Sequence, residues 1–78
     1  MKPIITEKAI MLIERENVLT FETGKRKTKE EIKREFEELF DTKIEKVRTL
    51  IRNNKKYVYI KLKKEFPAID LATKLGLM

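Results

Sequence analysis

The chain contains no cysteine and no histidine among its 78 residues. Their absence excludes disulfide bonds, thiol nucleophiles, imidazole general bases and the usual zinc ligands. Carboxylates remain, but the glutamates between residues 30 and 38 have the spacing of a solvated helix face. No neighbouring residue in the sequence would shift the pKa of one of these carboxyl groups into the range needed for acid–base catalysis. We therefore expect no enzymatic activity, no metal site and no cofactor.

Long hydrophobic runs are also absent. The longest apolar run, residues 9–13, is far too short to cross a bilayer, and no signal-peptide pattern precedes it. We expect a cytoplasmic protein that does not insert into membranes.

Positive charge dominates the residues that are present, giving a formal net charge of +6. The charge is uneven, because residues 43–64 hold nine Lys or Arg and a single acid, Glu45. Such asymmetry predicts a polyanionic partner. We expect residues 1–78 to form one small domain, whose core removes only about 60% of the unfolded surface from water. A domain of this size is expected to work bound to its partner.

Strict alternation predicts that residues 55–64 form a strand with two chemically different faces. One face carries Val58, Ile60 and Leu62, and the other carries Tyr57, Tyr59, Lys61 and Lys63. Asn53 and Asn54 separate this strand from a second alternating run, residues 47–52. The pattern predicts a hairpin closed by a two-residue turn.

A two-residue turn fixes the register of the hairpin. It pairs Lys46 with Lys61, Arg48 with Tyr59 and Leu50 with Tyr57. One hairpin face is therefore basic and aromatic. Rings can stack on bases of any sequence while cations displace counterions from phosphates, so this face is a candidate RNA or DNA surface. The alternative is a solvated sheet face whose tyrosines serve only as strand formers.

The same register would expose Ile44 and bury Glu45. We therefore expect a β-bulge near residues 43–46 that turns Ile44 inward.

Amphipathic helices are predicted on both sides of a strand at residues 18–23. The first helix begins after the N-cap Thr6 and ends at Asn17, and the second begins at a capping box of Thr28 and Glu31. The expected buried residues are Ile5, Ala9, Leu12 and Ile13 in the first helix, Leu19 and Phe21 in the strand, and Ile32, Phe36, Leu39 and Phe40 in the second helix. A short third helix is expected after Pro67.

This order of elements predicts an α+β fold. A right-handed crossover makes strand 18–23 parallel to the first hairpin strand, and the last strand fills the gap antiparallel to both. The sheet is then mixed or antiparallel, with three main strands, a split β-α-β crossover and two to three helices. Residues 2–4 can add a short fourth strand at the N-terminal edge.

Several segments match one known family in their order and spacing. They are Thr6-Glu7-Lys8-Ala9, Asn17 with Phe21, Thr28-Lys29-Glu30-Glu31-Ile32-Lys33, Leu39-Phe40, residues 43–49, Tyr59-Ile60-Lys61-Leu62, Ala68-Ile69-Asp70-Leu71-Ala72 and Leu75-Gly76. Over essentially its whole length the chain resembles the large-subunit ribosomal protein twenty-three family, and its C-terminal part resembles the archaeal form.

The resemblance implies a structural component of the large ribosomal subunit that binds ribosomal RNA (rRNA) near the polypeptide exit tunnel. It also implies a neighbour, large-subunit protein twenty-nine, and a docking surface for nascent-chain factors such as the signal recognition particle. Glu7 is then a factor contact, although it could equally serve only as a charge at a helix start. Bacterial members carry a long hairpin extension into the tunnel, whereas this tip is only Asn53-Asn54, so we expect no deep lining of the tunnel.

The predicted RNA-binding residues combine the hairpin face with positions implied by the resemblance. They are Lys8, Lys25, Arg26, Lys27, Lys29, Lys46, Arg48, Tyr57, Tyr59, Lys61 and Lys63. For the basic loop at residues 25–27, an exposed solubilising turn is the alternative to phosphate contact.

Two other functions fit parts of this pattern. A free-standing RNA chaperone or single-strand RNA-binding protein would use the same basic face, and would bind many single strands with similar affinity. A protein-interaction module would use the acidic face of the second helix and show little RNA affinity. A ribosomal protein should instead prefer one folded RNA fragment at moderate salt.

Overall fold

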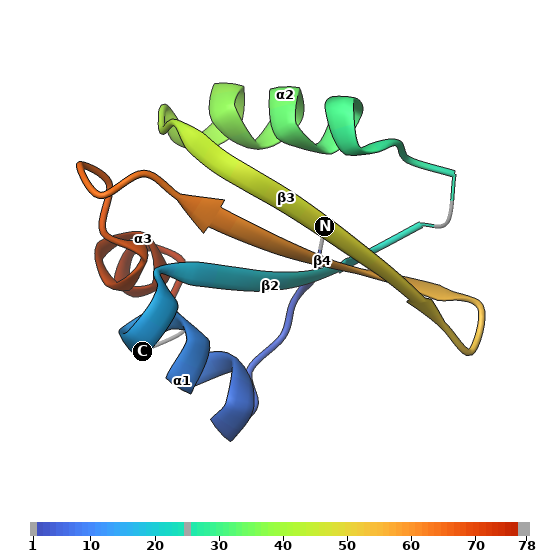
Figure 1. Cartoon of the computed structure of the whole chain (residues 1–78), viewed down its shortest axis with the longest axis horizontal. Coiled ribbons are helices and arrows are strands. Elements are labelled where there is room, and N and C mark those ends of the chain that lie inside the picture. Colours follow the sequence, from blue (N-terminus) through green and yellow to red (C-terminus); the bar gives the residue numbers. More distant parts are fainter. Residues whose placement is uncertain (1, 25, 77–78) are drawn as a thin grey trace.

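The computed structural model describes residues 2–24 and 26–76. Its elements are β1 (Lys2–Pro3), α1 (Glu7–Glu16), β2 (Val18–Thr23), α2 (Lys29–Phe40), β3 (Ile44–Arg52), β4 (Lys55–Leu62) and α3 (Ala68–Lys74). In the described part of the chain the strands form a four-stranded sheet in the order β1-β2-β4-β3. Figure 1 shows α2 along the β3 side of the sheet, and α1 and α3 together on the β2 side.

The sheet confirms the predicted α+β fold with a split β-α-β crossover. β4 is antiparallel to both β2 and β3, so β2 and β3 run parallel with β4 between them. The optional N-terminal edge strand is present as β1, which pairs antiparallel with β2 through Lys2 opposite Glu22 and Pro3 opposite Phe21. Proline is tolerated here because an edge strand leaves one side of its backbone unpaired.

The hairpin of β3 and β4 closes through the predicted two-residue turn. Asn53 and Asn54 have φ values of 52° and 64°, and a type I′ turn requires positive φ at both central residues. Asparagine accepts this left-handed conformation more readily than most residues. The turn sets Arg52 opposite Lys55, and the register expected from the sequence follows from there to Lys46 opposite Lys61.

The predicted bulge interrupts β3 between Ile44 and Lys46. It places Ile44 opposite Leu62 and buries it, while Glu45 stays exposed. The Ile44 amide donates to the Glu37 carboxylate at 3.0 Å, so the irregular backbone is satisfied by a side chain of α2.

Hydroxyl caps fix the starts of the two longer helices. Thr6 Oγ1 accepts from the Ala9 amide at 3.1 Å, and Thr28 Oγ1 accepts from the Glu31 amide at 3.2 Å. Each bond satisfies an amide that the first helical turn leaves without a partner. Both helix starts are therefore where the sequence predicts them.

The inner face of the sheet and the helices that cover it form the core. Its buried members include Leu19, Phe21, Ile44, Val58, Ile60 and Leu62 from the strands, Ile13, Ile32 and Phe36 from α1 and α2, and Ala68, Leu71 and Ala72 from α3. The Phe21 and Phe36 rings meet edge to face with centroids 5.6 Å apart, a favoured aromatic geometry.

Two residues predicted to be buried are exposed. Ile5 precedes the N-cap, so it does not share the helical direction of the α1 stripe, and it is 58% exposed. Leu39 is 67% exposed because Phe40, not Leu39, packs on Phe36, with ring centroids 4.7 Å apart. Leu12 and Phe40 are half-buried. The apolar stripes are thus narrower than the sequence pattern predicts.

Asn17 joins three elements where α1 ends. Its backbone is left-handed, with φ 58°, and its carbonyl accepts from the Leu62 amide at 3.1 Å. Its side-chain Nδ2 lies 3.0, 3.3 and 3.3 Å from the carbonyl oxygens of Leu62, Lys63 and Phe66. Its Oδ1 accepts from the Ala68 amide at 2.5 Å. One side chain therefore connects the end of α1, the end of β4 and the start of α3.

Removal of the Phe36 ring should test the core. Phe36→Ala should lower the free energy of unfolding by about 3 to 5 kcal/mol, because a fully buried ring would leave a cavity beneath the sheet. Leu39→Ala, on the same helix, is the matched control and should change it by no more than about 0.5 kcal/mol. Urea denaturation followed by circular dichroism measures both, and equal losses would place Leu39 in the core.

Two variants should separate the contribution of the Asn17 side-chain hydrogen bonds from that of its left-handed backbone conformation. Asn17→Gly keeps the left-handed conformation but removes the side-chain bonds, so we expect a loss of about 1 to 3 kcal/mol. Asn17→Asp should lose more at neutral pH, because it turns a carboxylate toward three carbonyl oxygens. Denaturation of both variants checks this order, and a glycine variant as stable as the parent chain would contradict it.

Candidate nucleic-acid interface

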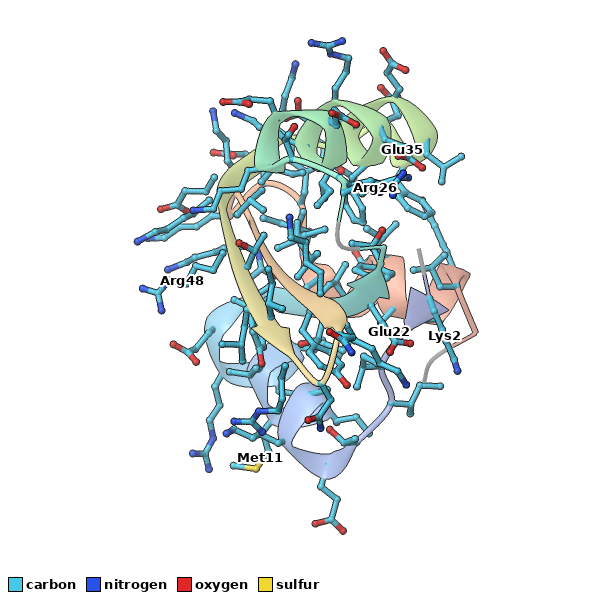
Figure 2. The ribbon with its side chains drawn as sticks, turned by 90° about the vertical axis from the view of Figure 1, so that its right-hand side faces the viewer. Lys2, Met11, Glu22, Arg26, Glu35 and Arg48 are labelled. Carbon is cyan, nitrogen blue, oxygen red and sulfur yellow. The ribbon has the colours of Figure 1, made fainter. Side chains whose placement is uncertain are left out.

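The sheet surface opposite the core is called here the outer face. Cross-strand pairing arranges its residues in three rows. The rows are Lys2, Glu22, Tyr57 and Leu50; then Thr20, Tyr59 and Arg48; then Val18, Lys61 and Lys46. The predicted hairpin residues thus lie together on one surface. Figure 2 shows Arg48 projecting away from β3 into solvent.

The cations of the outer face are exposed, and its tyrosines are half-buried. Lys46, Arg48 and Lys61 form no salt bridge among the residues that the structure describes. Lys55 differs, because its ammonium lies 3.4 Å from the Glu22 carboxylate. The outer face therefore offers positive charge that the protein itself does not neutralise.

Lys63 lies one residue beyond the end of β4. Its amide donates to the Lys43 carbonyl at 3.2 Å, and its own carbonyl accepts from Asn17. Hydrogen bonds thus fix the amide and the carbonyl of Lys63, while the residue is exposed. Lys63 therefore follows directly on the outer-face strand, and its place on the RNA surface stays a prediction.

Helix α1 forms one wall of a groove along the outer face. Lys8, Leu12 and Glu16 are spaced by four residues, so they share one side of the helix. They line the groove together with Val18, Lys46, Arg48, Leu50, Tyr59 and Lys61. Lys8, which the sequence links to RNA only through the family resemblance, thus joins the hairpin surface.

Sequence reasoning missed the contribution of Leu12 and Val18 to this surface. The helical pattern assigns Leu12 to the core stripe, but Leu12 is half-buried and lines the groove. The four-residue spacing of Lys8, Leu12 and Glu16 predicts that they lie on one side of the helix. It does not reveal which sheet face that side meets, because this depends on how α1 packs.

Arg26 and Lys27, the described residues of the basic loop, lie apart from the groove. Lys25 is outside the described residues. Arg26 is exposed, and Figure 2 shows it on a different side of the molecule from Arg48. Lys27 contacts other residues at the protein surface: its ammonium lies 2.6 Å from the Glu35 carboxylate, and its carbonyl accepts from Lys56 at 2.5 Å. The Lys27 ammonium lowers the pKa of the Glu35 carboxyl.

Lys29 and Glu7 begin α2 and α1, and both are exposed. Lys29 lines a small hollow with Lys46 and Val47, so it adjoins the edge of the outer face at β3. Glu7 sits in the first turn of α1, where a carboxylate interacts favourably with the helix dipole.

Residues 1–69 match the ribosomal protein L23 family. The chain belongs to this family. It is also 47% identical over 77 residues to the large ribosomal subunit protein uL23 of Methanothermobacter thermautotrophicus, an alignment that covers 97% of this chain and 90% of that protein. The predicted family and its archaeal type are therefore confirmed.

Membership of the L23 family confirms a structural protein of the large ribosomal subunit that serves in translation, and not an enzyme. The predicted ribosomal localisation is confirmed with it. The matched residues 1–69 contain the whole outer face, the basic loop and Glu7. Within residues 2–24 and 26–76, no helix has the length and apolar character needed to span a membrane, and no cluster of acidic residues could hold a metal ion.

Proposed function

We propose that this chain binds large-subunit rRNA near the polypeptide exit tunnel, with the outer face toward the RNA. In this proposal residues 1–78 act as one rRNA-binding domain and help form a docking surface for nascent-chain factors. The observation that carries it is the pairing of like charges on the hairpin, where Lys46 lies directly opposite Lys61 and next to Arg48.

Like charges directly opposite each other on a sheet destabilise it. Lys46 and Lys61 form such a pair, and no described carboxylate bridges them. A phosphate between the two strands would remove this repulsion and gain charge-assisted hydrogen bonds. The release of counterions from the RNA would add to the affinity. The like-charge pair therefore destabilises the free protein and favours the RNA-bound protein.

The acidic side chains support the same orientation. Glu30, Glu31, Glu35, Glu37 and Glu38 all belong to α2. Phe36 of the same helix packs on Phe21 of the inner face, so α2 covers the side of the sheet opposite the outer face. RNA at the outer face is thereby separated from most of these carboxylates, which would repel phosphates, although Glu30 lines the hollow at the β3 edge together with Lys46.

The exit-tunnel position is an extension from the family resemblance. The hairpin tip is only the two-residue turn at Asn53 and Asn54. We expect it to end near the tunnel wall without entering the tunnel deeply, beside large-subunit protein twenty-nine. Exposed Glu7 at the start of α1 is the proposed contact for the signal recognition particle.

Removal of basic side chains from the outer face should weaken RNA binding in a salt-dependent way. Replacing Lys61 and Lys63 with Ala should lower affinity for a large-subunit rRNA fragment that the parent chain binds. It should also flatten the dependence of log affinity on log salt, by up to about one unit for each phosphate that the variant no longer neutralises. Filter binding over a salt series measures both quantities.

The matched control replaces Arg34 on α2 and Lys74 on α3, which are both exposed, and so removes the same charge elsewhere. It should change affinity and salt slope much less. Co-sedimentation with large subunits after a high-salt wash tests the same pair of variants on the ribosome. If the Lys61 and Lys63 variant keeps the parent affinity and slope, the outer face is not the RNA surface.

Charge reversal at Glu7 should separate factor docking from assembly. Glu7→Lys should leave incorporation into the large subunit intact but weaken recruitment of the signal recognition particle, because reversing a rim charge mainly affects association with a charged partner. Glu14→Lys, an exposed reversal on the same helix, is the control. Binding of the particle to reconstituted ribosomes measures the effect, and equal recruitment by both variants would refute the role of Glu7.

A further inference from the structure

The groove between α1 and the outer face is as large as a small-ligand pocket. Its volume is about 590 Å³, within the range of about 300 to 1,000 Å³ for pockets that hold small ligands. A groove of that volume can hold one nucleotide, whereas a flat basic sheet face would offer only a surface for phosphates.

Apolar and aromatic side chains lie inside the groove. Leu12 on α1 and Val18 on β2 line it, together with Tyr59 on β4. All three are half-buried, so each keeps part of its surface available to a ligand. A tyrosine ring beside aliphatic groups is the environment in which a nucleobase stacks, and base stacking tolerates any sequence.

Cations stand at both walls of the groove. Lys8 is on the α1 side, and Lys46, Arg48 and Lys61 are on the hairpin side. Two acids, Glu16 and Glu45, also line it, so cations outnumber acids by two. None of the four cations forms an ion pair within the described part of the chain. The groove thus combines an apolar interior with walls suited to phosphates.

We propose that this groove takes one unstacked nucleotide of single-stranded RNA, with its base between Leu12 and Tyr59 and its flanking phosphates at Lys8 and the hairpin cations. The inference rests on the proposed RNA binding and narrows it to an RNA loop, bulge or single strand. A paired base lies inside the duplex stack and could not enter, so a duplex would contact only the cations.

The tyrosine content of the chain allows a direct test. The protein has two tyrosines and no tryptophan, so Tyr57→Phe leaves Tyr59 as its only strong fluorophore. A base stacked on Tyr59 should quench this emission. The probes are a short oligouridylate and a blunt-ended RNA duplex with the same number of phosphates. We expect the single strand to quench Tyr59 on binding, and the duplex to bind with little quenching.

Affinity measurements on further variants complete the test. Tyr59→Leu and Leu12→Ala should each weaken oligouridylate binding by roughly 5- to 150-fold while leaving duplex binding nearly unchanged. Met11→Ala, on the exposed side of α1, is the matched control and should bind both RNAs like the parent chain. Circular dichroism melts identify any variant that fails to fold, and Tyr59→Leu keeps a residue that packs well in a strand.

The outcomes separate this inference from the proposed function. Equal quenching by both RNAs, or an unchanged oligouridylate affinity in Tyr59→Leu, would overturn the nucleotide groove even if replacement of Lys61 and Lys63 still weakens rRNA binding. If that lysine variant also binds rRNA like the parent chain, RNA binding by the outer face is wrong as well. Selective quenching, with selective weakening in Tyr59→Leu and Leu12→Ala, supports the groove.

Discussion

The hydrogen bonds of Asn17 are the constraint on which the arrangement of the other elements depends. A left-handed residue must end α1 here so that β2 can start one residue later, and its side chain then holds both the end of β4 and the start of α3. Asn17 lies between Glu16 and Val18, which both line the groove, and its Nδ2 donates to the carbonyl of Leu62, the residue after Lys61. One side-chain amide therefore holds the end of α1 beside the end of β4.

The bulge in β3 solves a second problem, because one strand must serve two surfaces. Perfect alternation would place Glu45 toward the core and Ile44 in water, at a cost in burying a charge without a partner. One extra residue reverses this assignment, so that Ile44 packs inside while Lys46 still lies opposite Lys61 on the outer face. The Glu37 carboxylate accepts the amide freed by the irregularity. Core packing and the basic outer face are thereby compatible in the same nine-residue strand.

Features determined by neighbouring residues could be predicted from the sequence, whereas features determined by packing could not. The Asn53-Asn54 turn, the threonine caps, the bulge and the pairing of Arg48 with Tyr59 all follow from local patterns. The exposure of Leu39 does not, because only the contact between Phe36 and Phe40 decides which flank of α2 faces the core. Similarly, the sequence predicts that Lys27 is an unpaired cation, but the turn before α2 places its ammonium beside the Glu35 carboxylate. The groove forms because Lys8 and Leu12 of α1 lie toward the outer face of the sheet. The sequence of a single segment does not determine how α1 packs on the sheet.

The crossover topology also explains how the chain can carry a basic surface and a strongly acidic helix without neutralising itself. Helix α2 connects two parallel strands and packs through Phe36 onto the inner face, so its carboxylates, apart from Glu30 at the β3 edge, are held on the opposite side of the sheet from Lys46 and Lys61. On the same side, flexible glutamates could pair with those lysines, as Glu35 pairs with Lys27 and Glu22 with Lys55. Like-charge repulsion on the outer face then remains in the free protein, and a phosphate backbone can relieve it. A fold determined mainly by apolar packing thus also keeps the cations of the outer face available to an external anion.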